Sequence, residues 1–219
     1  MDMKKCVIVG AGICDIQRLK KKMAVLDDDL CIAADGGLAY LMQIGRMPDL
    51  VLGDMDSLRD EEMLRALDGE VCVRRLPVEK DDTDMLAAIK EGLEAGYRQF
   101  EIYGALGGRI DHTFANVQCL LYLQNRGARG IIVGDDAALM LVRDGSIAFE
   151  AEDAVKGRRV SVFAYGGDAY GVSECGLKYL LDHVTVKQEF PVGVSNEFMG
   201  EAARIEVESG MLLVCVEEL

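Results

Sequence analysis

The chain has 219 residues, of which 50% are hydrophobic and 28% charged, as is typical of a globular protein with its own core. Its formal net charge of −14 argues against a general nucleic-acid binder, because such a protein carries a basic face. No apolar run approaches the roughly 20 residues that a membrane-spanning helix needs. The first residues lack the layout of a secretory signal, so we expect a cytoplasmic protein.

Short apolar runs alternate with amphipathic stretches through the first part of the chain. Continuous apolar runs are typical of a parallel sheet that is covered on both faces. We expect strands at residues 6–9, 31–34, 50–52, 71–73, 100–103 and 131–133. Between them, apolar side chains at helical spacing predict two buried helix faces, Met85-Leu86-Ile89-Leu93 and Phe114-Val117-Leu120-Leu121-Leu123. This alternation predicts an α/β domain with a mostly parallel sheet and flanking helices.

The pattern changes after about residue 136. Short runs, several of them alternating apolar with polar residues, follow one another with turns and without clear helices. We expect strands at residues 138–142, 147–149, 159–163, 184–186, 204–207 and 211–214. These features predict an antiparallel β-sandwich or barrel. We place the domain boundary at residue 143, which gives an α/β domain over residues 1–143 and a β-domain over 144–219.

The cysteines and histidines argue against a zinc site. There are seven cysteines without a Cys-x-x-Cys pair, and the only histidines are His112 and His183. Cysteines inside apolar runs are expected to be small, reduced core residues. These are Cys6, Cys31, Cys72, Cys119 and Cys215.

Glycine and aspartate gather in four clusters, each directly after a predicted strand. In an open parallel sheet, the loops that follow the strands meet at one edge, and ligands bind there. The clusters should therefore converge in space. They are Asp35-Gly36-Gly37, Gly53-Asp54-Met55-Asp56-Ser57, Lys80-Asp81-Asp82-Thr83-Asp84 and Gly107-Gly108-Arg109-Ile110-Asp111-His112.

The chemistry of these clusters is that of a metal-dependent polyphosphate site. Glycines let backbone N–H groups approach phosphate oxygens, and helix N-termini add donors and partial positive charge. Asp54 and Asp56 lie two residues apart and can share a magnesium ion, which would separate the acidic protein from polyphosphate. Arg109 is a candidate for stabilising charge on a transferring group.

Each cluster taken alone also has a plain structural explanation. Asp84 suits an acidic first helical turn, Asp35-Gly36-Gly37 suits a turn, and Ser57 suits a helix cap. The chain has no G-x-x-x-x-G-K-[ST] run, which argues against a P-loop kinase. Gly10-Ala11-Gly12 begins a dinucleotide fingerprint, but Asp15 stands at the place of the third glycine.

The ordered set of motifs resembles that of the thiamine pyrophosphokinases. In the first domain the resemblance rests on Asp35-Gly36-Gly37, on Pro48-Asp49 with residues 53–57, on Lys80-Asp81-x-Thr83-Asp84, and on residues 107–112. In the second it rests on Gly176-Leu177-Lys178-Tyr179 and Val194-Ser195-Asn196-Glu197-Phe198. The resemblance implies an ATP-dependent thiamine diphosphokinase that forms a homodimer, with thiamine between the first domain of one subunit and the second domain of the other.

The same resemblance implies roles for individual residues. Magnesium would be held by Asp54, Asp56 and Asp81 or Asp84. Ser195 and Asn196 would contact the thiamine pyrimidine, and Asp84 also belongs to the substrate site. ATP would be bound by Asp35, Gly36, Gly37, Gly53, Ser57, Thr83, Gly107, Gly108, Arg109 and His112.

The residues leave the base and the acceptor open. Asp81, Asp84 or Asp111 could orient or deprotonate the attacking hydroxyl, with Arg109 stabilising the transition state. A diphosphokinase for another hydroxymethyl heterocycle, such as a pterin, is the nearest alternative. A magnesium-dependent phosphohydrolase and a non-catalytic nucleotide- or thiamine-binding module are the others.

Overall fold

The computed structural model describes residues 4–25, 30–53, 71–77 and 81–217. The chain forms two compact units, residues 1–135 and 136–219, and each is described by itself. The boundary that we expected at residue 143 falls inside the first strand of the second unit, Ala137–Phe149. Within the described ranges, no helix is both long and apolar enough to cross a membrane.

The first unit is built on a parallel sheet, as the sequence predicted. Its strands pair in the order β6-β5-β1-β2-β3-β4, and every one of these pairings is parallel. The central strands are buried almost throughout, which explains their continuous apolar sequences. The bounds are β1 Lys5–Val9, β2 Leu30–Ala34, β3 Leu50–Gly53, β4 Cys72–Arg75, β5 Gln99–Tyr103 and β6 Arg129–Val133.

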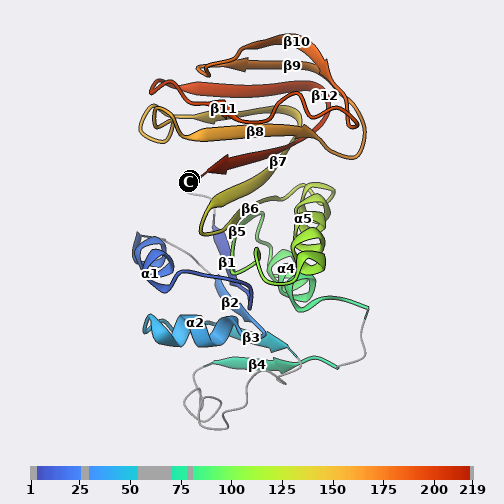
Figure 1. Ribbon diagram of the computed structural model, residues 1–219. Helices are drawn as coiled ribbons and strands as arrows, with labels where there is room; N and C mark the ends of the chain where they lie inside the picture. Colours follow the sequence, from blue (N-terminus) through green and yellow to red (C-terminus); the bar gives the residue numbers. More distant parts are fainter. Residues whose placement is uncertain (1–3, 26–29, 54–70, 78–80, 218–219) are drawn as a thin grey trace. The chain divides into compact units, whose positions relative to one another are not determined.

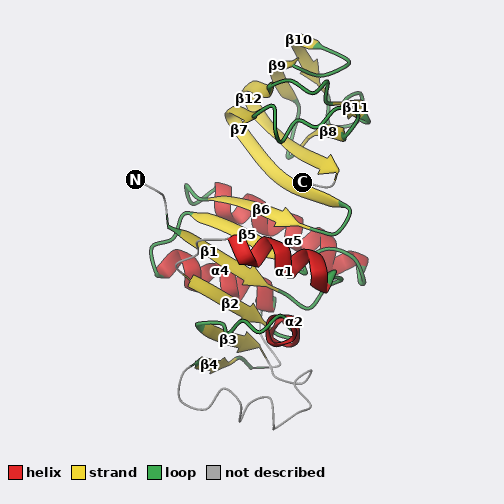
Figure 2. Ribbon diagram, turned by 90° about the vertical axis from the view of Figure 1, so that its left-hand side faces the viewer, coloured by secondary structure: helices red, strands yellow, loops and turns green. Residues whose placement is uncertain are grey.

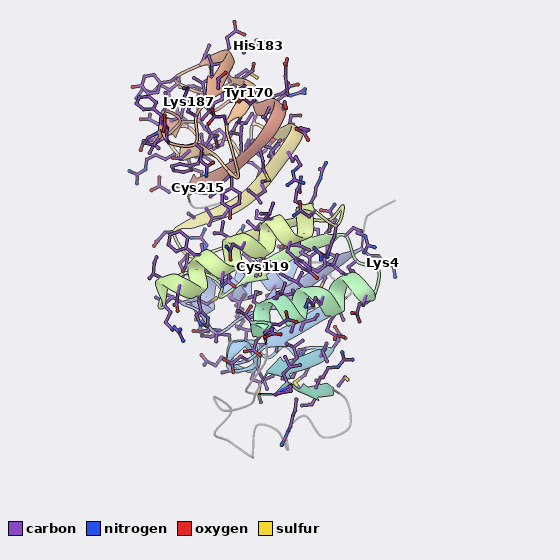
Figure 3. The ribbon with its side chains drawn as sticks, turned by 90° about the vertical axis from the view of Figure 1, so that its right-hand side faces the viewer. Lys4, Cys119, Tyr170, His183, Lys187 and Cys215 are labelled. Carbon is purple, nitrogen blue, oxygen red and sulfur yellow. The ribbon has the colours of Figure 1, made fainter. Side chains whose placement is uncertain are left out.

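Helices cover both faces of this sheet. Helices α1 (Ile16–Val25) and α2 (Gly37–Gln43) lie on one face, and α4 (Asp84–Glu94) and α5 (Ile110–Gln124) lie on the other (Figures 2 and 3). Helix α4 buries Met85 and Ile89 as predicted. Helix α5 buries Val117, Cys119, Leu120 and Leu123, with Asn116 among them. Our placement of Phe114 on the buried face was wrong, because its side chain is 68% exposed.

The strand order contains a switch point between β1 and β5. From β1 the chain proceeds to β2 on one side, whereas β5 pairs on the other side of β1 and continues to β6. The loops after β1 and β5 therefore lead to helices on opposite faces of the sheet (Figure 2). A crevice opens between such loops at the carboxyl ends of the strands, which is where open α/β sheets bind ligands.

The second unit is an antiparallel β-sandwich, again as predicted (Figure 1). Two long strands run through it, β7 (Ala137–Phe149) and β12 (Ala203–Glu217), and a register shift divides their pairing between Val207 and Met211. Before this shift β12 also pairs with β9 (Ala169–Cys175), which pairs with β10 (Leu181–Val186). After it, β12 pairs with β8 (Arg159–Ala164), which pairs with β11 (Asn196–Glu197).

The long strands replace pairs of shorter ones that we expected. Residues 138–142 and 147–149 belong to the single strand β7, and residues 204–207 and 211–214 belong to β12. The irregularity near Gly210 bends β12 without ending it, so the sequence resembles two strands.

All seven cysteines are free. Cys6, Cys31 and Cys119 are buried as expected, and Figure 3 labels Cys119 on α5 and Cys215 on β12. Our placement of Cys72 in the core was wrong. It lies on β4, which pairs with β3 at one edge of the sheet and whose residues are all exposed.

Candidate active site

A cavity of about 460 Å³ lies at the switch point of the first unit. Its wall combines the loop after β1, the loop after β5 and the starts of α4 and α5. Residues of three of the four clusters therefore converge here, whereas Gly53 is not among the lining residues and residues 54–57 lie outside the described residues. The lining residues that carry the argument are Asp35, Thr83, Asp84, Arg109, His112 and Asn116.

The loops after β1 and β5 are hydrogen-bonded to each other through their backbones. Gly12 N donates to Gly104 O at 2.7 Å, and Ile13 N donates to Leu106 O at 3.0 Å. A Cβ on Gly104 would lie 2.3 Å from Gly10 O, and its φ of 58° also favours glycine. These close backbone contacts occupy amides of the first loop, so they are not available to a ligand.

Carboxylates also occupy the start of α1. Asp15 caps this helix, because its Oδ1 accepts from Arg18 N at 2.8 Å. Asp15 N in turn donates to Asp135 Oδ1 and Oδ2, at 2.8 and 3.0 Å. Burial, followed by the charges of Asp135 and Asp15, raises the pKa of the Cys14 thiol to about 11. The acidic surroundings argue against dinucleotide binding at Gly10-Ala11-Gly12, since that site requires a phosphate at this position.

The start of α5 has the opposite character. Gly107 and Gly108 adopt φ values of 76° and 67°, and Arg109 occupies the N-cap position. No other described residue accepts a hydrogen bond from the backbone amides of Gly107, Gly108 or Arg109. These donors and the positive end of a 15-residue helix favour an anion. Gly107, Gly108, Arg109 and His112 all line the cavity.

Arg109 and Asp111 form a two-contact ion pair at this helix start. Arg109 Nη2 lies 2.6 Å from Asp111 Oδ2, and Nε lies 3.2 Å from Oδ1. The hydrogen bond from Arg109 holds the pKa of Asp111 below its ordinary value, and the carboxylate raises the pKa of Arg109. A carboxylate with a lowered pKa is a weaker base. In this arrangement, Asp111 orients Arg109 at the edge of the cavity.

The start of α4 supplies a hydroxyl and a carboxylate. Thr83 caps this helix, with its Oγ1 accepting from Leu86 N at 3.2 Å, and Asp84 is the acidic residue of the first turn. Both line the cavity, so the capping interpretation and the ligand interpretation apply to the same residues. Asp81 is exposed and is not among the lining residues. Asp82 pairs with Lys90 at 2.5 Å.

The cluster after β2 divides into one lining residue and two packing residues. Asp35 has a φ of 50° and lines the cavity. Gly36 occupies the N-cap position of α2, and Gly37 begins this helix against the end of β1. A Cβ on Gly37 would lie 1.9 Å from Val9 O. Gly36, Gly37 and Gly53 are not among the lining residues, so contacts between them and ATP remain a prediction.

The predicted magnesium ligands are only partly within the described residues. Asp54, Asp56 and Ser57 lie outside them. Among the residues that are described, no group of three or more histidine, cysteine, aspartate or glutamate side chains is arranged to hold a metal. The acidic side chains that line the cavity, Asp35 and Asp84, offer carboxylate oxygens, which are the ligands that magnesium prefers.

In the second unit, Asn196 is bonded entirely within the protein. Its Nδ2 donates to Glu174 Oε2 at 2.9 Å and to Tyr179 O at 2.6 Å. Its Oδ1 accepts from Tyr179 N and from Glu197 N, both at 2.9 Å. Four bonds fill the capacity of a carboxamide. Asn196 therefore ties the loop after β9 to β11.

Ser195 stands beside Asn196 in a conformation that is rare outside glycine. Its φ is 62°, and its backbone N donates to Ser161 Oγ at 3.0 Å. The exposed Ser195 therefore belongs to a tightly determined turn. Its predicted contact with the thiamine pyrimidine is not tested by these bonds.

Sequence analysis did not assign several residues of the cavity wall to the site, among them Tyr40, Met85 and Asn116. Tyr40 OH donates to Gly12 O at 2.8 Å and so braces the loop after β1. Met85 was assigned only to the helix core. Asn116 lies four residues after His112, on the same side of α5, and this spacing was the signal that could have identified it.

Two family models match the chain. The model described as "Thiamin pyrophosphokinase, catalytic domain" matches residues 22–132, and "Thiamin pyrophosphokinase, vitamin B1 binding domain" matches residues 146–212. The chain is 24% identical over 185 residues to a thiamine pyrophosphokinase of Bacillus subtilis, covering 84% of this chain and 86% of the relative. It is 26% identical to thiamine pyrophosphokinase 1 of Oryza sativa, covering 75% of this chain and 64% of that relative.

Solved structures have the same fold. The crystal structure of thiamine pyrophosphokinase from Bacillus subtilis matches with a TM-score of 0.85 at 23% identity, covering 98% of this chain and 99% of that one. The structure of the Geobacillus thermodenitrificans protein matches with a TM-score of 0.81 at 26% identity, covering 98% of each chain. Because the catalytic-domain model matches just over half of the chain and the second model covers most of the rest, the chain belongs to the thiamin pyrophosphokinase family.

Proposed function

We propose that this protein is a thiamine diphosphokinase, which transfers a diphosphate group from ATP to the hydroxyl of thiamine and releases AMP. The observation that carries the proposal is the cavity at the switch point, with the donor-rich start of α5 in its wall. Family membership supplies the reaction, and the cavity supplies a place for the polyphosphate.

The phosphates of ATP would lie against residues 107–112. Gly107, Gly108 and the first turn of α5 offer backbone N–H groups, and Arg109 adds a positive charge that Asp111 keeps in place. Thr83 can donate its hydroxyl hydrogen while its oxygen caps α4. The carboxylates at the start of α1 would repel phosphate, which favours the α5 side of the cavity.

Asp54, Asp56 and Asp81 or Asp84 would hold magnesium. Of these, Asp84 lies in the cavity wall, and all four side chains offer the oxygen ligands that suit this ion. Bound magnesium would neutralise negative charge on the phosphate oxygens.

In the reaction, the thiamine hydroxyl oxygen forms a bond to the β-phosphorus, and the bond between that phosphorus and the oxygen bridging to the α-phosphate breaks. AMP leaves with the electron pair of the broken bond. Asp81 or Asp84 would take the hydroxyl proton, because Asp111 has a lowered pKa and is engaged with Arg109. Arg109 would stabilise charge on the transferring group.

Thiamine would bind with help from the second unit, in a homodimer. Asn196 ties together two loops with large exposed apolar side chains, which is what an interface or a ring-binding surface needs. Ser195 ends the second of these loops, directly before β11, and the resemblance assigns it to the thiamine pyrimidine together with Asn196. The exposed side chains are Tyr179, Leu180, Phe190, Val192 and Val194.

The free state of all seven cysteines fits a reducing compartment such as the cytoplasm.

The test is AMP release by the purified protein with ATP and magnesium, with and without thiamine. We expect AMP only when thiamine is present, in equal amount to thiamine diphosphate. Thiamine monophosphate, whose hydroxyl is blocked, is the matched control and should give none. AMP formed equally without thiamine would point to a hydrolase. AMP formed only with a hydroxymethyl pterin would reassign the acceptor.

A further inference from the structure

Asn116 lines the cavity and carries a hydrogen-bond acceptor that no described residue uses. The residue lies on α5, is only 9% exposed and lines the cavity wall. Its single hydrogen bond to the described part of the chain runs from Nδ2 to Ala105 O, at 2.7 Å. A carbonyl oxygen only accepts, so the atom of Asn116 that faces Ala105 must be the nitrogen. The orientation of the carboxamide is therefore fixed.

This orientation leaves Oδ1 as the unpaired atom. No described side chain or backbone group donates to Oδ1, and Oδ1 is not among the fully buried side-chain atoms that lack a hydrogen-bond partner, so it keeps contact with solvent. A polar atom in such a place is satisfied by a ligand or by water that the ligand displaces. Oδ1 has no hydrogen, so the matching ligand group must be a donor.

Of the parts of ATP, only the nucleoside carries donors. The phosphate oxygens accept hydrogen bonds and carry negative charge, so a carboxamide oxygen repels them. The adenine amino group and the ribose hydroxyls donate. We propose that Asn116 is a specificity-determining residue, whose Oδ1 accepts a hydrogen bond from a nucleoside donor of the bound nucleotide. This rests on the proposed function only in taking ATP as the nucleotide.

The rest of the cavity wall suits a nucleotide whose phosphates and nucleoside bind at different places. The anion-binding groups gather at Gly107, Gly108 and Arg109, at the start of α5, and Asn116 lies farther along the same helix. Ile13 and Met85 contribute apolar surface to the same cavity. A nucleotide with its phosphates on the helix start would therefore place its nucleoside where Asn116 can select it.

A nucleotide that lacks the recognised donor should bind more weakly, because Oδ1 then stays unpaired in a site from which water is displaced. Unpaired polar groups of this kind reduce affinity by about tenfold. The effect should depend on Asn116 and should disappear when its side chain is removed.

The experiment compares dissociation constants by calorimetry, with magnesium and without thiamine, so that no transfer occurs. The nucleotides are ATP, 2′-deoxy-ATP, 3′-deoxy-ATP and the triphosphate of purine riboside, which lacks the amino group. In the unmodified protein, one of the three analogues should bind about tenfold more weakly than ATP. In Asn116→Ala this gap should fall to less than about twofold. The identity of the analogue distinguishes the amino group from each hydroxyl.

Loss of the Asn116–Ala105 hydrogen bond should change the dissociation constants of all four nucleotides alike. The ratio between two nucleotides, measured in the same variant, is therefore independent of that loss. Gln118→Ala changes an exposed residue of the same helix and should keep the full gap. Asn116→Ser, which retains a polar side chain too short to reach the same position, serves if the alanine variant does not fold. Equal binding of all four nucleotides to the unmodified protein, or an unchanged gap in the Asn116 variant, would overturn the proposal. AMP release with thiamine is a separate measurement, so tight and selective ATP binding without turnover would leave this inference standing and reject the diphosphokinase.

Discussion

Asn116 in the first unit and Asn196 in the second are both more than nine-tenths buried, but their side chains are used in opposite ways. Asn116 makes one hydrogen bond to the described residues and lines a cavity. Asn196 makes four and has no capacity left. The same residue type is therefore a ligand group in one place and a structural clamp in the other. The difference lies in which hydrogen-bond positions the fold has already filled.

The glycines of the first unit show the same contrast. Gly37 has no room for a side chain, because a Cβ would lie 1.9 Å from Val9 O. A Cβ on Gly108 would meet nothing within 4 Å. Both belong to motifs that the sequence analysis assigned to ATP. Packing requires the first glycine, whereas the second leaves open space in front of its backbone.

Substitution of Arg109, the exposed arginine at the start of α5, should have the largest effect on activity. Arg109→Ala should lower kcat by about a hundredfold to a thousandfold, as for removal of other groups that stabilise transition-state charge. The thermal unfolding midpoint should stay close to that of the unmodified protein, because the Arg109 side chain is 72% exposed and its ion pair with Asp111 lies at the surface. Steady-state AMP release and a thermal melt check the two halves of this prediction.

Arg126→Ala is the matched control, since Arg126 lies just beyond the other end of α5 and stacks on Tyr122. It should leave kcat unchanged. A loss of activity in Arg109→Ala that follows a loss of folded protein would show that Arg109 acts through stability and not through its charge at the cavity.

The two glycines should differ in stability. Gly37→Ala should lower the free energy of unfolding by about 3 kcal/mol or more, because the new Cβ forces the start of α2 away from β1. Gly108→Ala has open space and only its φ of 67° to overcome, which costs about 1 kcal/mol. Urea unfolding of both variants measures the difference. Equal losses would mean that the close approach at Gly37 does not determine its identity.

The sequence predicted the parallel sheet, its helices and the convergence of three of the four clusters, because apolar periodicity and strand order are local or topological properties. It did not predict which cluster residues face the ligand. Gly37 and Asn196 carry family motifs, yet the packing of Val9 and the bonds to Tyr179 and Glu174 decide what they do. Those partners are distant in sequence. Asn116 was missed for the converse reason, since the role of a buried asparagine in an apolar helix becomes visible only when its partner among the described residues, Ala105, is known.

Removing the Asn196 side chain, which holds the loop after β9 to β11, should destabilise the second unit. Asn196→Ala leaves Glu174 and both backbone groups of Tyr179 without their partner, which should reduce the free energy of unfolding by about 2–3 kcal/mol. Ser195→Ala is the control. It keeps the backbone bond to Ser161 and should cost less than about 1 kcal/mol. Chemical unfolding followed by circular dichroism measures both. A fully stable Asn196→Ala protein that binds thiamine poorly would instead make Asn196 a ligand group, and the contrast with Asn116 would fail.

Glu174, which accepts a hydrogen bond from Asn196 Nδ2, should make the stability of the second unit depend on pH. Burial raises the pKa of Glu174 to about 7, although the hydrogen bond from Asn196 opposes the shift. In the unfolded chain the same carboxyl has its ordinary pKa of 4.5. Between these values the folded state holds the proton more tightly than the unfolded state does. The contribution of Glu174 to stability is therefore present below about pH 4.5 and is lost as the pH rises through about 7.

Glu174→Gln should remove this loss, because a glutamine keeps an acceptor for Asn196 Nδ2 and carries no charge. The variant should match the unmodified protein at about pH 4 and exceed its free energy of unfolding by about 1–3 kcal/mol at about pH 8. Urea unfolding at the two pH values measures the difference, with Glu201→Gln, an exposed carboxyl, as the control that should show none. The difference in the free energy of unfolding between Glu174→Gln and the unmodified protein could instead be the same at both pH values. That result would mean that Glu174 stays in one protonation state. The clamp would then work through hydrogen bonds alone, and its stability would not respond to pH in the neutral range.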